Sequence, residues 1–169
     1  FSPRTLLTKQ KAHCLEGALF SAVALALQGK RPLVMNLKTA RGDQDHAVAL
    51  YRVDGYWGAI SKTNHAVLRF RDPIYKTVRE LALSYFHEYF LYKDGRKTLR
   101  SYSNPIDVRE CGTGWITSPK DVWPVANYIA SRPHTLLIPK GMERSIRPAT
   151  RFERTTVEYM EWKKSNPRT

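Results

Sequence analysis

The stretch from Leu15 to Leu27 constrains the fold most strongly, because it is apolar except for Glu16 and Ser21. Its apolar residues recur at helical spacing, and the opposite face of that helix is apolar as well. A helix that is apolar nearly all round is predicted to be buried at the centre of a domain. The run is too short to cross a bilayer, which takes about 20 apolar residues. We therefore expect a central helix that begins near Cys14 and ends near Gly29, and no association with a membrane.

The segment after this helix predicts an antiparallel sheet. Residues His46 to Val53 are strand-like, and the following Asp54-Gly55 is typical of a tight hairpin turn. Further strands are predicted over 33–37, 56–61 and 66–70, and an amphipathic helix over 77–92. The fold class expected is α+β, with the central helix packed on the antiparallel sheet.

The remaining segments have weaker patterns. Residues 1–11 resemble an entry arm, and 101–119 carry the Pro, Gly and Ser residues of a loop. A short helix over 122–131, a strand over 135–138 and a helix over 157–164 are predicted. We expect a functional core over residues 1–100 and an irregular basic C-terminal extension over 101–169 that packs on it.

The composition suggests an anionic partner and a reducing environment. Lys and Arg total 28 against 15 Asp and Glu, a net charge of +13, and basic residues continue from Lys140 to the C-terminal end. Phe152, Tyr159 and Trp162 alternate with those basic residues, a combination that suits single-stranded nucleic acid. No recognisable nucleic-acid-binding module is present, so a solvated or partner-facing basic arm is the favoured interpretation. The 2 cysteines cannot form a dense disulfide framework, although one disulfide is formally possible. We expect a cytoplasmic protein.

Cys14 and His46 are the residues whose side chains are best suited to catalysis. A thiol is a weak nucleophile until it ionises, and its ordinary pKa is about 8.5. The unpaired N–H groups at the start of a helix favour the thiolate and also stabilise the oxyanion of a tetrahedral intermediate. An imidazole nearby accepts the thiol proton and later protonates a leaving amine. Cys14 at the start of the central helix and His46 at the start of a strand fit these two roles.

A cysteine on a helix, a strand that begins His-Ala-Val and a return through Gly-Tyr-Trp-Gly resemble the transglutaminase-like superfamily of papain-type cysteine enzymes. The resemblance covers residues 12–70 and implies a papain-like core, with Cys14 as the nucleophile and His46 as the general base. The family pattern also implies an Asp after the returning strand, but counting from Trp57 that place holds Ser61. Asn64 is the nearest amide, so Ser61 and Asn64 are equal candidates to orient His46.

Other interpretations of these residues involve metal binding or packing. His13, Cys14, His46 and His65 are possible zinc ligands, but no paired-ligand spacing is present, so we expect no metal and no cofactor. His65 is an alternative residue to face the cleft. The aromatic residues between Tyr85 and Phe90 are interpreted as part of the core.

The resulting hypothesis is thiol-dependent acyl chemistry on a peptide or protein amide, either hydrolysis as in a cysteine protease or amidase, or acyl transfer as in a transglutaminase. The alternative hypothesis is a non-catalytic protein of the same fold whose basic C-terminal region holds an anionic partner such as nucleic acid. The missing Asp and the charge of +13 favour this alternative.

Overall fold

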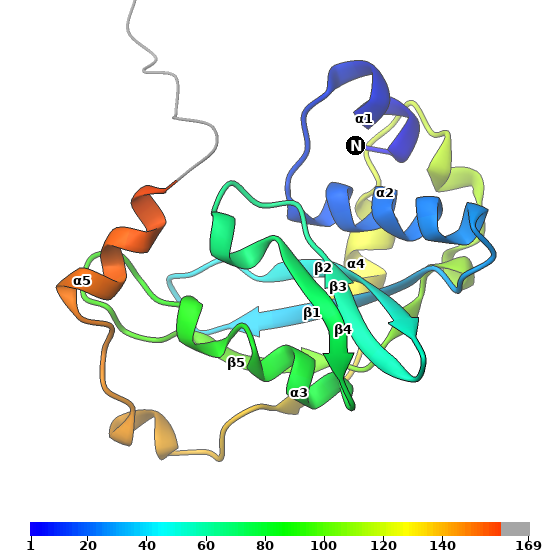
Figure 1. The fold of residues 1–169 in the computed structure, drawn as a ribbon. Helices are drawn as coiled ribbons and strands as arrows, with labels where there is room; N and C mark the ends of the chain where they lie inside the picture. The colour runs from blue at the N-terminus through cyan, green and yellow to red at the C-terminus, as the bar shows by residue number, and fades with distance from the viewer. Residues whose placement is uncertain (160–169) are drawn as a thin grey trace, which may run out of the picture.

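A computed structural model describes residues 1–159 of the chain, and in it one seven-stranded antiparallel sheet is combined with helices (Figure 1). The strand order is β4-β3-β2-β1-β5-β7, and β6 also pairs with β1. The strands are β1 Leu33–Thr39, β2 His46–Val53, β3 Tyr56–Ile60, β4 Phe70–Tyr75, β5 Leu99–Ser103, β6 Ile106–Asp107 and β7 His134–Leu136. The α-helices are α1 Pro3–Lys9, α2 Cys14–Leu27, α3 Val78–Leu83, α4 Trp123–Ser131 and α5 Arg151–Arg154. The α+β class predicted from the sequence is confirmed.

The sheet separates two apolar cores. Side chains alternate between the faces of a strand, so Val48 and Leu50 of β2 enter one core while Ala47 and Ala49 enter the other. The first core lies between the sheet and α3, and the second lies between the sheet and α2 with α4, as Figure 1 shows. A strand that is buried on both faces needs a continuous apolar run, which explains the sequence pattern of β2.

Helix α2 packs on the sheet through small side chains. Ala18, Leu19 and Ala22 have no exposed surface and belong to the same core as Ala47 and Ala49. The prediction that α2 is buried all round is wrong at its C-terminal end, where Leu27 is 86% exposed. The cause is that α2 covers only one face of the sheet, so its outer side reaches solvent beyond α1.

The hairpin of β2 and β3 is confirmed. Asp54 and Gly55 have φ values of 48° and 86°, as a turn with both central residues in the left-handed region requires. The pairs Val53↔Tyr56 and Arg52↔Trp57 follow directly from the two-residue turn. The hairpin extends from this turn to the end of the sheet where β2 begins.

Two predicted elements in the middle of the chain differ from the structure. The helix expected over 77–92 ends at Leu83, because Arg71 Nη2 donates to the Ser84 carbonyl at 3.3 Å and Arg71 Nε donates to the Ser84 hydroxyl at 2.9 Å. The strand expected over 66–70 is a 3-10 helix at Ala66–Leu68, and β4 starts only at Phe70. It then continues through Pro73, which an edge strand tolerates.

The ends of the chain are more regular than predicted. The expected entry arm contains α1, whose N-cap Ser2 accepts a hydrogen bond from Thr5 N at 3.2 Å. The loop expected over 101–119 is wrong at its start, because β5 and β6 pair with β1, so the sheet extends past the predicted boundary at residue 100. The helix predicted over 122–131 is confirmed as α4. Of the helix predicted over 157–164, only a 3-10 turn at Thr155–Glu158 lies within the described residues.

The helices of residues 1–159 were also compared with the length of a membrane span. None of them is both long and apolar enough to cross a bilayer.

Candidate functional site

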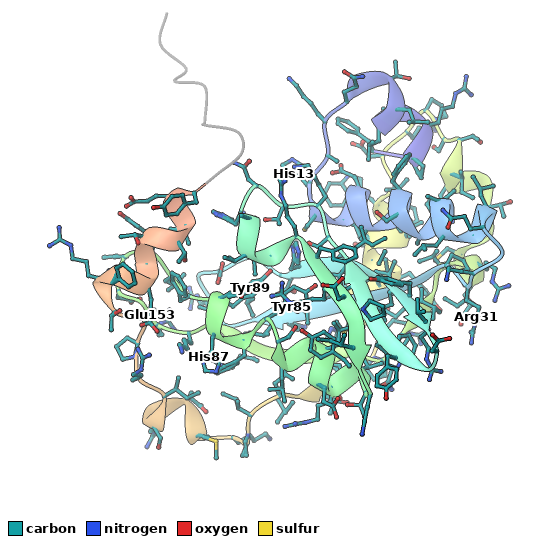
Figure 2. The ribbon with its side chains drawn as sticks, viewed as in Figure 1. His13, Arg31, Tyr85, His87, Tyr89 and Glu153 are labelled. Atoms are coloured by element: carbon teal, nitrogen blue, oxygen red, sulfur yellow. The ribbon has the colours of Figure 1, made fainter. Side chains whose placement is uncertain are left out.

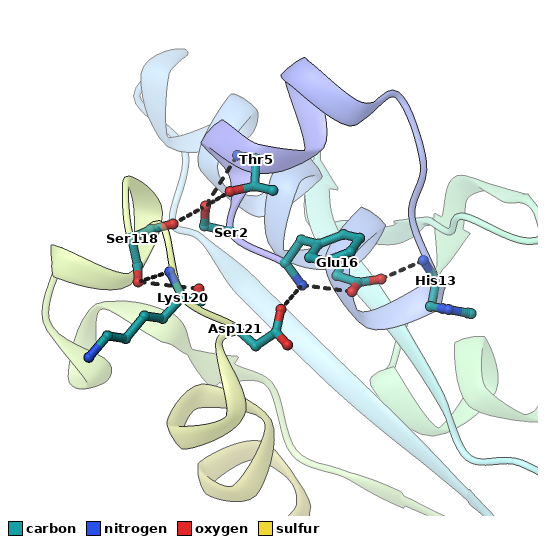
Figure 3. Close-up of polar contacts among 8 residues, drawn as sticks. Ser2, Thr5, His13, Glu16, Ser118, Lys120 and Asp121 are labelled. Carbon is teal, nitrogen blue, oxygen red and sulfur yellow. Dashed lines mark hydrogen bonds and ion pairs between the residues drawn. The ribbon is translucent and has the colours of Figure 1, made fainter.

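Cys14 is the first residue of α2, as predicted. His13 is the N-cap in an extended conformation, and its backbone N–H donates to Glu16 Oε2 at 2.5 Å (Figure 3). This capping contact fixes the direction in which the chain enters the helix. Cys14 is half-buried, so part of the residue is exposed to solvent.

Helix α1, which lies beside α2, is also held in place by hydrogen bonds. The Ser2 hydroxyl donates to the Ser118 carbonyl at 2.7 Å, so α1 is tied to the loop that precedes α4 (Figure 3). Helix α1 in turn packs on α2. The first turn of α2 is therefore supported by contacts on the side away from the sheet as well.

His46 is the first residue of β2 and is almost completely buried, with 6% of its surface exposed. Its Nε2 and the Ser61 hydroxyl are 2.5 Å apart. The Tyr89 ring lies against the imidazole, with 6.1 Å between the ring centroids. The ring is thus held by one hydrogen bond and by packing, and its Nδ1 has no hydrogen-bond partner among the described residues.

The Cys14 sulfur lies next to the chain segment that leads into His46. Its Sγ is 3.9 Å from the carbonyl oxygen of Asp45, the residue that precedes His46. The Asp45 carboxylate accepts hydrogen bonds from the backbone N–H of Thr39 at 2.8 Å and from its hydroxyl at 3.2 Å. These bonds fix the loop between β1 and β2, so the thiol and the imidazole are at the same end of the sheet.

The loop that carries Ser61 packs against the first turn of α2. A Cβ atom added to Gly17 would lie 2.2 Å from Lys62 Cβ, so only glycine permits this approach. The Ser61 N–H donates to the Arg69 carbonyl at 2.7 Å, which holds the other side of the loop. Helix α2, β2 and the loop after β3 therefore meet at one place.

Between the two candidates to orient His46, the hydrogen bond comes from Ser61. Asn64 follows in the same loop and is half-buried. His65, the alternative residue to face the cleft, is half-buried too, and its Nδ1 is a buried atom with no hydrogen-bond partner among residues 1–159.

Burial lowers the pKa of His46 to about 4, well below its ordinary value of 6.5. The cause is the loss of water around the ring, which disfavours the charged imidazolium. Ser61 carries no charge that would offset this effect. At neutral pH His46 is therefore a neutral imidazole, available to accept a proton.

Tyr89 belongs to this site, although the sequence analysis assigned it only to the core. It is 7% exposed and packs on His46. Its pKa is raised first by burial and second by the electrostatic effect of Cys14. The helical spacing of the aromatic residues indicated burial, but its proximity to His46 depends on the packing of residues 84–90 on β2.

Metal ligation by the histidines and cysteines receives no geometric support. Among residues 1–159, no group of three His, Cys, Asp or Glu side chains is arranged to hold a metal ion. Cys14 and Cys111 are both free thiols, and Cys111 lies in the 3-10 helix Val108–Cys111.

A comparison of the sequence with models of known protein families finds no match, and a comparison with curated proteins finds none either. The residues and their geometry therefore carry the functional argument.

Gly17→Ala is expected to destabilise the protein by about 1–3 kcal/mol, because the new methyl group overlaps Lys62 Cβ. Ala is the better helix former by up to about 1 kcal/mol, so helix propensity alone predicts the opposite sign. Urea unfolding measures the difference.

The matched control is Gly114→Ala, because a Cβ there meets no atom within 4 Å. This variant should stay within about 0.5 kcal/mol of the wild type. A stabilised Gly17→Ala protein would show that α2 and the loop after β3 do not approach each other this closely.

His46 predicts a pH-dependent stability. Between pH 6.5 and about 4 the unfolded chain binds a proton at His46 that the folded chain excludes, so the free energy of unfolding falls as the pH falls through this window. The contribution is about 3 kcal/mol over the window and is constant above it. His46→Asn should lose that part of the pH dependence, as measured by urea unfolding at a series of pH values.

The control for this experiment is Lys120→Gln, which removes an exposed lysine. It should keep the wild-type pH dependence. Parallel stability curves for the wild type and His46→Asn would contradict the burial of a neutral imidazole.

Proposed function

We propose that this protein performs thiol-dependent acyl chemistry on an amide, with a core of the transglutaminase-like, papain type. Cys14 is the nucleophile, His46 is the general base and Ser61 orients His46. The observation that carries the proposal is the joint position of three groups. The sulfur lies 3.9 Å from the carbonyl that precedes His46, and the imidazole is held through Nε2 by Ser61.

The hydrogen bond with Ser61 supports different roles for the two imidazole nitrogens. When Nε2–H donates to the Ser61 hydroxyl, Nδ1 has a free lone pair. Nδ1 then takes the proton from the Cys14 thiol as the sulfur attacks the amide carbonyl. In this tautomer His46 is a base toward the thiol, and Ser61 holds the ring in place.

The reaction follows from this arrangement. Attack of the Cys14 sulfur gives a tetrahedral intermediate whose oxyanion faces the backbone N–H groups at the start of α2. The C–N bond then breaks, the leaving amine takes the proton from His46, and a thioester on Cys14 remains. Water or a second amine attacks the thioester, and His46 transfers the proton again, so the products are an acid or a new amide.

The absence of a charged partner on His46 supports a neutral starting pair. A carboxylate would stabilise the imidazolium, whereas Ser61 offers only a hydroxyl, and burial lowers the pKa of His46 to about 4. Proton transfer therefore accompanies sulfur attack instead of preceding it.

The alternative is a non-catalytic protein that holds an anionic partner, and the specific observation in its favour is also Ser61. A histidine whose hydrogen bond goes to a serine lacks the charged partner that stabilises an imidazolium. The charge of +13 provides the attraction for an anion. The reactivity of Cys14 distinguishes these two functions.

Alkylation by iodoacetamide tests the catalytic proposal in a Cys111→Ala background, where Cys14 is the remaining thiol of the chain. We expect the wild type to be labelled readily near neutral pH, because neutral His46 takes the thiol proton as the sulfur attacks. His46→Gln should slow the labelling by about tenfold or more, since the base is lost. Ser61→Ala should slow it as well, because the imidazole then loses the hydrogen bond that orients it.

Two controls accompany this experiment. Cys14→Ala should abolish labelling, and p-nitrophenyl acetate should leave a hydroxylamine-sensitive thioester on Cys14 of the wild type but none on His46→Gln. A labelling rate that follows an ordinary thiol pKa of about 8.5 in both the wild type and His46→Gln supports the binding function instead.

A further inference from the structure

A hollow of about 480 Å³ lies at the end of the sheet away from the thiol. Lys30 and Arg31 border it from the turn before β1, and Arg52 and Trp57 border it from the β2–β3 hairpin. Figure 2 shows Arg31 at the right-hand edge of the molecule and His13 above its centre. Arg52 is six residues along β2 from His46, a distance of about 20 Å in an extended strand. The hollow is therefore separate from the Cys14 site.

The floor of this hollow is apolar and belongs to one face of the sheet. Leu33 pairs with Leu50 on the neighbouring strand, and Arg52 pairs with Trp57. Leu50 and Arg52 are two residues apart, so both pairs lie on the same face. Leu33 and Leu50 are buried, which gives the hollow a hydrophobic base.

The rim is cationic. Lys30, Arg31 and Arg52 all line the hollow, and its lining contains no Asp or Glu. Arg31 Nη2 is 3.1 Å from Asp107 Oδ2, so its charge is paired. Lys30 and Arg52 have no carboxylate partner among the described residues. Two uncompensated positive charges therefore border an apolar floor.

Arg52 and Trp57 form a cation–π pair at the side of the hollow. The Arg52 guanidinium carbon lies 4.8 Å from the centre of the indole ring, and its Nη2 donates to the Gly55 carbonyl at 2.7 Å. The hydrogen bond holds the guanidinium over the indole. Guanidinium and indole groups are among those on which proteins place heteroaromatic rings.

We propose that this hollow binds a mononucleotide, that is, a planar heteroaromatic ring that carries a phosphate group. The volume is in the range that holds one small ligand. The ring packs on Leu33, Leu50 and the Arg52–Trp57 pair, and the phosphate dianion pairs with Lys30 and Arg52. The proposal is independent of the acyl chemistry, because no Cys14 site residue takes part.

Isothermal titration calorimetry with three probes at low salt tests this site. The probes are AMP, adenosine and inorganic phosphate, which supply ring and anion together, ring alone and anion alone. AMP should bind at least about tenfold more tightly than either of the others, because each part adds its own contacts. Lys30→Gln should weaken AMP binding by about tenfold and leave the weak binding of adenosine within about twofold, because Lys30 contacts only the phosphate. Arg52→Gln should weaken the binding of both AMP and adenosine, because Arg52 contacts the ring as well as the phosphate.

The matched control is Lys120→Gln, which removes an exposed lysine outside the hollow and should bind AMP like the wild type. Lys30 and Arg52 are exposed, so these variants are expected to fold, and circular dichroism verifies it. Binding of AMP no tighter than that of phosphate or adenosine overturns the proposal. Equal weakening by Lys120→Gln overturns it as well, since the basic surface as a whole would then be responsible.

Discussion

The close contact between Gly17 and Lys62 is the constraint on which the arrangement of this protein depends. Helix α2 and the sheet come from separate parts of the chain, and small side chains let them approach. At the first turn of α2 even a methyl group is excluded, because its place is occupied by Lys62. The residue before Lys62 is Ser61, so the same contact that seats the helix also fixes the group that holds His46.

The electrostatics of the site follow from this packing. A tightly packed imidazole loses its hydration, and the serine beside it returns only one hydrogen bond. The folded chain therefore keeps His46 neutral and ready to accept a proton, but stabilises its protonated form poorly. An acidic residue in the place of Ser61 would reverse that balance at the cost of burying a second charge.

The parts of the fold that the sequence predicts well are those with local causes. The spacing of apolar residues marks α2, and Asp54-Gly55 alone specifies the hairpin turn. The end of α3 was missed because Arg71, from β4, occupies the carbonyl of Ser84. Strand β5 was missed because it pairs with β1, which is some 60 residues earlier in the chain.

The residues of the candidate site also fall into two groups, those with a local sequence signal and those without one. Cys14, His46 and Ser61 could be named because each has a recognisable place at the start or end of an element. Tyr89 could not, since its contact with His46 exists only after residues 84–90 pack on the sheet. Long-range contacts of this kind leave little trace in a single sequence.

The two-residue turn of the β2–β3 hairpin controls more than its own conformation. His46 opens one arm and Ser61 follows the other, so the offset between these two side chains is set at Asp54 and Gly55, at the opposite end of the hairpin. One extra amino acid inserted at this turn would shift the register of β2 against β3. His46 would then be separated from Ser61, although neither residue is changed. An insertion in this turn would therefore disrupt a site that lies the full length of a strand away.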